Sequence, residues 1–122
     1  MEKAYKLSEK ILDEINLYEE QYKTLEGKNI ITDDSIQNLN TIIEEGFTLY
    51  KYLVEKNLYE QNPEMRISLL ELEKYMNKLT INKENAENLK LTSAMQIWNQ
   101  CKVIIAILAA TVIDTYENKD KQ

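Results

Sequence analysis

Apolar residues recur along the first part of the chain at alternating spacings of four and three: Ala4, Ser8, Ile11, Ile15, Tyr18, Tyr22 and Leu25. This is the heptad spacing of a helix that packs along one seam. It predicts a helix over about residues 3–26. We expect Gly27 to end this helix, because glycine tolerates the left-handed conformation common at helix C-termini.

A second helix is predicted over about residues 32–61. Thr32 is placed to cap it, and Asp33 and Asp34 lie in the first turn, where the helix dipole favours negative charge. Its stripe comprises Ile36, Leu39, Ile43, Phe47, Tyr50 and Val54, widened by Ile42, Leu49 and Leu53.

The next residues, Asn62-Pro63-Glu64, are typical of a helix start: Asn caps, Pro fits the first turn, and Glu suits the dipole. They predict a third helix over about residues 63–80, with its stripe at Met65, Leu69, Leu72, Met76 and Leu79.

A fourth helix is predicted over about residues 83–117, capped by Asn82 and roughly 50 Å long, about twice the length of the third. Its seam is Ala94, Ile97, Cys101, Ile104 and Leu108, with Trp98, Ile105 and Val112 alongside. Two interpretations stay open: this wide face is the most buried part of the core, or it extends beyond its neighbours and binds a partner.

The pattern predicts an all-α fold, either a four-helix bundle or a long antiparallel helical hairpin with a long C-terminal helix. With 2 Gly and 1 Pro, the chain has little material for β-turns. No linker or low-complexity tract interrupts it, so residues 1–122 are expected to form a single helical domain.

Composition narrows the function. The net charge is −6, all of it in residues 1–60, and Arg66 is the sole arginine, which argues against nucleic-acid binding. There is no histidine, and the single cysteine, Cys101, lies in an apolar run. We therefore expect no catalytic site, no cofactor and no metal site.

Neither a signal peptide nor a membrane span is expected, since the apolar stretch Val103–Ile113 is about half the roughly 20 residues that a span needs. A cytoplasmic location is predicted. The carboxylate pairs Glu44–Glu45 and Glu71–Glu73 are interpreted as solvated faces.

Among the 8 tyrosines, Tyr52, Tyr59 and Tyr116 fall off the predicted stripes and are candidates for a partner surface. The motif Tyr116-x-x-x-Asp120 matches a pattern of type VII secretion substrates, but the same spacing recurs at Tyr5/Glu9, so it has little specificity.

Two segments resemble the FlgN-type flagellar export chaperones. The first is ILDEINLYEEQYKTL at residues 11–25, followed by Lys28, Asp34, Leu39, Ile42 and Glu44-Glu45; the second is Asn85-Ala-Glu-Asn88-Leu89 with Thr115-Tyr116 near the C-terminus. The resemblance implies a helical cytoplasmic protein that holds a helical segment of an export substrate.

We therefore expect a non-enzymatic, protein-binding chain that contacts another protein, or a second copy of itself, through the last helix. The candidate partner-binding residues are Trp98, Ile105, Val112 and Tyr116. The alternative function is a small acidic helical inhibitor or immunity protein from a phage, plasmid or bacteriocin locus.

Overall fold

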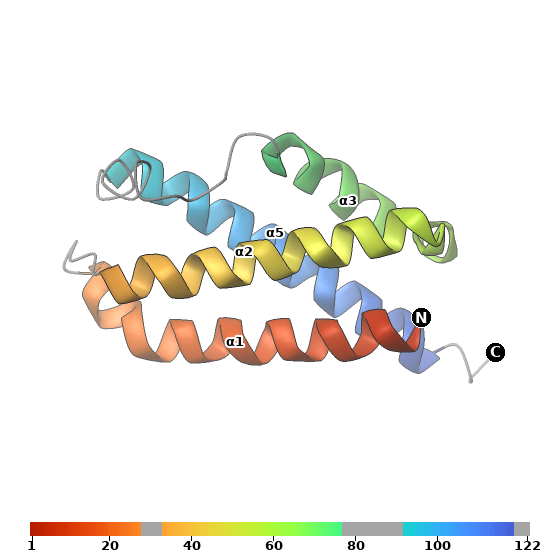
Figure 1. Ribbon diagram of the computed structural model, residues 1–122, viewed down its shortest axis with the longest axis horizontal. Helices are drawn as coiled ribbons and strands as arrows, with labels where there is room; N and C mark the ends of the chain where they lie inside the picture. Colours follow the sequence, from red (N-terminus) through yellow and green to blue (C-terminus); the bar gives the residue numbers. More distant parts are fainter. Residues whose placement is uncertain (28–32, 77–91, 119–122) are drawn as a thin grey trace.

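The computed structural model describes residues 1–27, 33–76 and 92–118. They form α1 (Glu2–Gly27), α2 (Asp33–Glu55), the 3-10 helix η1 (Leu58–Gln61), α3 (Pro63–Met76) and α5 (Thr92–Asn118). This part of the chain contains no strand, and the predicted all-α class is confirmed. Helices α1 and α2 lie side by side, α5 crosses behind them, and α3 packs against the flank of α5 that faces away from α1 (Figure 1).

The described parts of the heptad stripes of α1 and α3 are buried as predicted, while the side chains of Tyr22, Leu25 and Met76 lie outside the described residues. On α1 the buried stripe residues are Ala4, Ser8, Ile11, Ile15 and Tyr18, and on α3 they are Met65, Leu69 and Leu72. On each helix the stripe residues face the core and are removed from water, whereas Leu17 on α1 and Ile67 and Leu70 on α3 lie off the stripe and are exposed.

The core face of α2 is rotated from the predicted stripe. Its buried residues are Leu39, Ile42, Ile43, Gly46, Leu49 and Leu53, whereas Phe47 and Tyr50 are half-buried and Val54 is 40% exposed. The predicted step from Ile43 to Phe47 missed Gly46, whose lack of a side chain lets α5 approach closely. A Cβ atom at Gly46 would lie 2.5 Å from Cδ1 of Ile105.

Helix α2 also ends earlier than residue 61. Asn57 has φ 54°, in the left-handed region, so the α-helix stops at Glu55 and the chain continues as η1. Asn tolerates this conformation better than most residues. Helix α1 ends at Gly27 as predicted, but not through a left-handed cap, because no glycine among the described residues has positive φ.

The predicted start of α3 is confirmed by its hydrogen bonds. The side-chain Oδ1 of Asn62 accepts a hydrogen bond from the Glu64 N–H at 2.9 Å, and Pro63 is the first helical residue. The Asn62 amide also donates to Oγ1 of Thr115 on α5 at 2.9 Å. One asparagine therefore both caps α3 and fixes its start against the end of α5.

Several predictions lie outside the described residues. These are the Thr32 and Asn82 caps, the end of the third helix near residue 80, the start of the fourth near residue 83, and Leu79. Within the described ranges, α3 spans 14 residues and α5 spans 27.

Candidate protein-binding surface

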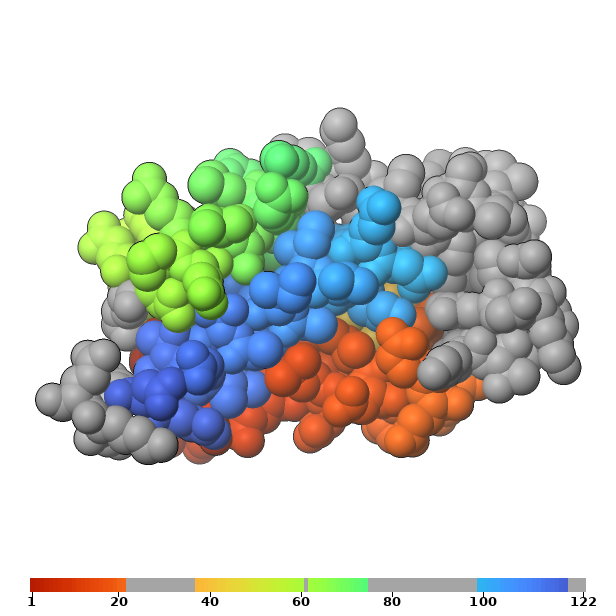
Figure 2. Space-filling view, turned by 180° about the vertical axis from the view of Figure 1, so that it is seen from behind, coloured from red at the N-terminus to blue at the C-terminus, as the bar shows by residue number. Residues whose placement is uncertain are grey.

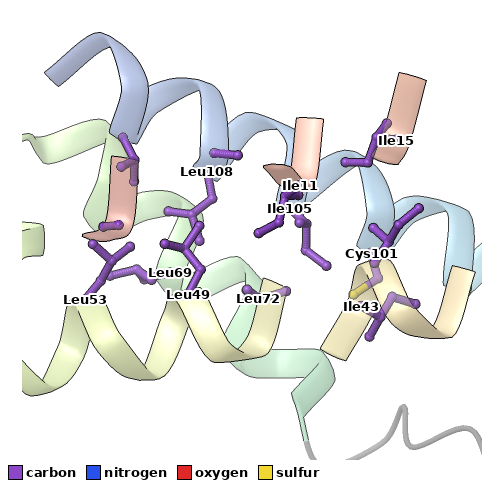
Figure 3. Close-up of a cluster of buried hydrophobic side chains, with 14 of the residues drawn as sticks. Ile11, Ile15, Ile43, Leu49, Leu53, Leu69, Leu72, Cys101, Ile105 and Leu108 are labelled. Carbon is purple, nitrogen blue, oxygen red and sulfur yellow. The ribbon is translucent and has the colours of Figure 1, made fainter. Parts of the chain in front are cut away.

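The inner face of α5 forms the centre of the core. Cys101, Ile105, Leu108 and Val112 are each 0% exposed and are spaced 4-3-4. Figure 3 shows Ile105 and Leu108 among side chains from α1, α2 and α3, including Ile11, Leu49 and Leu72. The prediction that Ile105 and Val112 face a partner is therefore wrong, because three neighbouring helices enclose this side of α5.

Tyr116 was also predicted to meet a partner, but its ring is stacked within the chain. It lies 4.3 Å from the ring of Tyr5, centroid to centroid, at an interplanar angle of 23°. The Tyr5 hydroxyl donates to Oε1 of Glu117 at 3.3 Å. Burial, together with the Glu9 and Glu117 carboxylates, raises the pKa of Tyr5. These contacts join the start of α1 to the end of α5.

The fourth predicted partner residue, Trp98, belongs to α5, and its side chain lies outside the described residues. Of the other tyrosine candidates, Tyr52 is half-buried, and the Lys3 Nζ atom lies 5.4 Å from the centroid of its ring. Tyr59 lines a groove between α2 and α3.

The outer face of α5 carries apolar residues that sequence reasoning did not single out. Val103 and Ile107 are each 53% exposed and lie one helical turn apart. Beside them is an open hollow of about 390 Å³ lined by Asn99, Gln100, Val103 and Ile104. Figure 2 shows α5 at the molecular surface, running diagonally between α3 and α1. The spacing of Val103 and Ile107 was the available signal, but it was hidden because α5 is apolar on every side.

The groove between α2 and α3 is smaller, at about 210 Å³. Burial, followed by the charge of Glu73, raises the pKa of Tyr50 in this groove. Val54 and Leu70 expose 40% and 54% of their surface. The complete lining is Tyr50, Val54, Tyr59, Arg66, Leu69, Leu70 and Glu73.

Lys102 occupies the flank of α5 that faces α1 and is only 4% exposed. Its Nζ atom lies 2.6 Å from Oε1 of Glu19 and 4.5 Å from the centroid of the Tyr18 ring. Ion pairing and the negative face of the aromatic ring offset the desolvation of this buried charge. The sequence analysis did not single out Lys102; its helical spacing to the buried residues Ile105 and Ala109 was the available signal.

The described residues offer little reactive chemistry. Burial raises the pKa of the Cys101 thiol to about 12, so this thiol stays protonated and unreactive. No group of three Cys, Asp or Glu side chains in the described part is placed to hold a metal ion. Glu44, Glu71 and Glu73 are exposed as predicted, whereas the Glu45 side chain is only 19% exposed and pairs with Lys10.

Comparison with known proteins gives no assignment: no family model matches the chain, and neither the curated proteins nor the solved structures contain a match. None of the helices in the described ranges combines the length and apolar character required to cross a membrane.

Proposed function

We propose that this chain is a non-enzymatic protein that binds a helical segment of another protein on the outer face of α5. The observation that supports the proposal is the pair Val103 and Ile107, each 53% exposed on a helix whose opposite face is fully buried. Large apolar side chains on both faces of one helix are costly in water unless a partner covers the outer ones.

The outer face suits helix-in-groove packing. Side chains one turn apart contact successive turns of a partner helix, and the neighbouring hollow offers room for an apolar anchor. Asn99 and Gln100 at its edge carry amides that can donate and accept hydrogen bonds at the rim of such a contact.

A specific form of this proposal is that the chain is an export chaperone resembling the FlgN type. The resemblance of residues 11–25 and 85–89 to that family supports it, as does an exposed apolar helix face. In this function, α5 would hold a helical segment of an export subunit until secretion.

The test is calorimetric titration of the full chain with peptides that span the helices of hook-associated subunits, the export substrates of FlgN-type chaperones, from the same genome. We expect the double variant Val103→Asp, Ile107→Asp to raise Kd about tenfold or more, as for loss of an anchor residue. Asn16→Asp, an exposed change on α1, is the matched control and should leave Kd unchanged.

Three outcomes would each reject or redirect part of the proposal. Failure of every such peptide to bind would reject the chaperone function. If the wild type instead self-associates in sedimentation equilibrium and the double variant does not, the outer face of α5 binds a second copy of the chain. Equal behaviour of the wild type and the double variant in both assays would reject the outer face as a binding surface.

A further inference from the structure

Two carboxyl groups meet across the interface between α1 and α2. The Nζ atom of Lys10 lies 3.2 Å from Oε1 of Glu45, which brings this part of α1 against α2. Glu14 follows Lys10 by one helical turn and therefore lies on the same side of α1. The carboxyl groups of Glu14 and Glu45 are within hydrogen-bonding range of one another.

The inner oxygens of both groups lack a donor. Oε2 of Glu14 and Oε2 of Glu45 are shielded from solvent, and neither accepts a hydrogen bond within the described part of the chain. An ionised carboxylate can only accept hydrogen bonds, so two ionised groups cannot satisfy each other. A single proton between them supplies the missing donor and removes one negative charge.

The charged residues around Glu14 and Glu45 provide few positive partners for the two carboxyl groups. On α1, Lys10 pairs with Glu45, and Tyr18 lines the same groove as Glu14. On α5, Lys102 faces α1 but is paired with Glu19 at 2.6 Å.

The remaining neighbour on α2 adds no positive charge. Glu44 is exposed and accepts a hydrogen bond from the Asn40 amide at 3.3 Å. Among the described residues, Lys10 is thus the one cation that contacts the pair, against two carboxyl groups.

We propose that Glu14 and Glu45 share one proton across the α1–α2 interface, so that this contact strengthens when the proton binds and weakens when it is released to solvent. The affected region includes the groove of about 240 Å³ between α1 and α2, lined by Glu14, Leu17, Tyr18, Gln21, Asn38, Thr41 and Ile42. The Glu14–Glu45 pair is separate from the proposed binding surface on α5.

The pH range follows from the titration of Glu14. Burial first, and then the hydrogen bond and charge of Glu45, raise the pKa of Glu14 from 4.5 to about 7, and Lys10 opposes this rise. In the unfolded chain the carboxyl ionises at its ordinary pKa, so between pH 4.5 and about 7 the folded state binds more protons. The stability from the shared proton is complete below the ordinary pKa and is lost as pH rises to about 7.

The experiment combines a direct titration with a comparison of variants. Carbon-13 NMR of the wild-type side-chain carboxyls should give Glu14 a midpoint well above the ordinary pKa of 4.5. In Glu14→Gln, the amide donates to Glu45 at every pH and mimics the protonated form. The wild type should therefore lose about 3 °C or more in Tm relative to Glu14→Gln between about pH 5 and pH 8.

Glu20→Gln, an exposed change on the same helix, is the control, and its Tm difference from the wild type should stay constant over this range. If Glu14→Gln does not fold, Glu45→Gln takes its place, since its amide can donate to Glu14. An ordinary midpoint for Glu14 would overturn the proposal. A Tm difference between the wild type and the folded Gln variant that does not change with pH would overturn it equally.

Discussion

Two adjacent residues on α5 show the reverse of the usual burial: the charged Lys102 is buried, and the apolar Val103 is exposed. Lys102 is 4% exposed on the flank that faces α1, and Val103 is 53% exposed on the outer face. The ion pair with Glu19 and the Tyr18 ring compensate the buried charge of Lys102, whereas Val103 has no such compensation for its contact with water. At these two positions, burial is decided by where the neighbouring helices pack rather than by the hydropathy of the residue.

The largest expected effect comes from opening a cavity on the inner face. Leu108 is 0% exposed, so Leu108→Ala should reduce the free energy of unfolding by roughly 2–5 kcal/mol. Ile107→Ala, one residue away on the outer face, is the control and should cost less than about 0.5 kcal/mol. Urea denaturation measures both. Similar losses in the two variants would mean that α5 does not have distinct inner and outer faces.

The close contact between α2 and α5 is tested by adding one methyl group. In Gly46→Ala the new Cβ would lie 2.5–2.9 Å from three side-chain carbons of Ile105, which is itself 0% exposed. Overpacking costs roughly 1–3 kcal/mol, while the better helix propensity of alanine returns about 1 kcal/mol. We expect net destabilisation in urea denaturation. Restored stability in Gly46→Ala, Ile105→Val would identify this contact as the cause.

These contacts show which parts of the fold the sequence could predict. The described parts of the stripes of α1 and α3 were predicted correctly because their residues recur at heptad spacing along one side of each helix, although Leu17, Ile67 and Leu70 lie outside the stripes and are exposed. On α2, Gly46 gave no hydrophobic signal although it is buried against Ile105. The end of α2 at Glu55 was missed because it depends on the backbone conformation of Asn57, with φ 54°.

The candidate binding surface was harder to predict than the fold. Helix α5 has apolar residues all around, so its sequence could not show whether Ile105 or Ile107 faces the core. Which face is buried depends on where α1, α2 and α3 pack against α5. In the structure, Ile105 and Val112 face the core, whereas Val103 and Ile107 are exposed on the outer face. The stacking of Tyr116 on Tyr5 joins residues at opposite ends of the chain, and no local pattern predicts such a contact.

Replacing the buried Lys102 should reduce the free energy of unfolding moderately, and by an amount that depends on the new residue. Lys102→Ala removes the ion pair, the ring contact and the packing of the long aliphatic stem, and should cost about 1–2 kcal/mol. Lys102→Met keeps an apolar stem of similar length, so it should stay within about 1 kcal/mol of the wild type. Urea denaturation at low and high salt measures both. Equal losses in the two variants would show that the charge, rather than the stem, holds α5 to α1.

The smallest effect on stability is expected for a substitution on the outer face of α5, which should instead weaken binding of a partner. Val103→Lys places on the outer face the same residue type that is buried next to it, and its long side chain can extend into water from a position that is already 53% exposed. The free energy of unfolding should therefore change by less than about 0.5 kcal/mol. Helix-in-groove binding should weaken, since a charge would enter an apolar contact. Urea denaturation together with calorimetric titration separates the two quantities. A large loss of stability would mean that Val103 is covered within the chain, and the outer face of α5 would then no longer be a candidate binding surface.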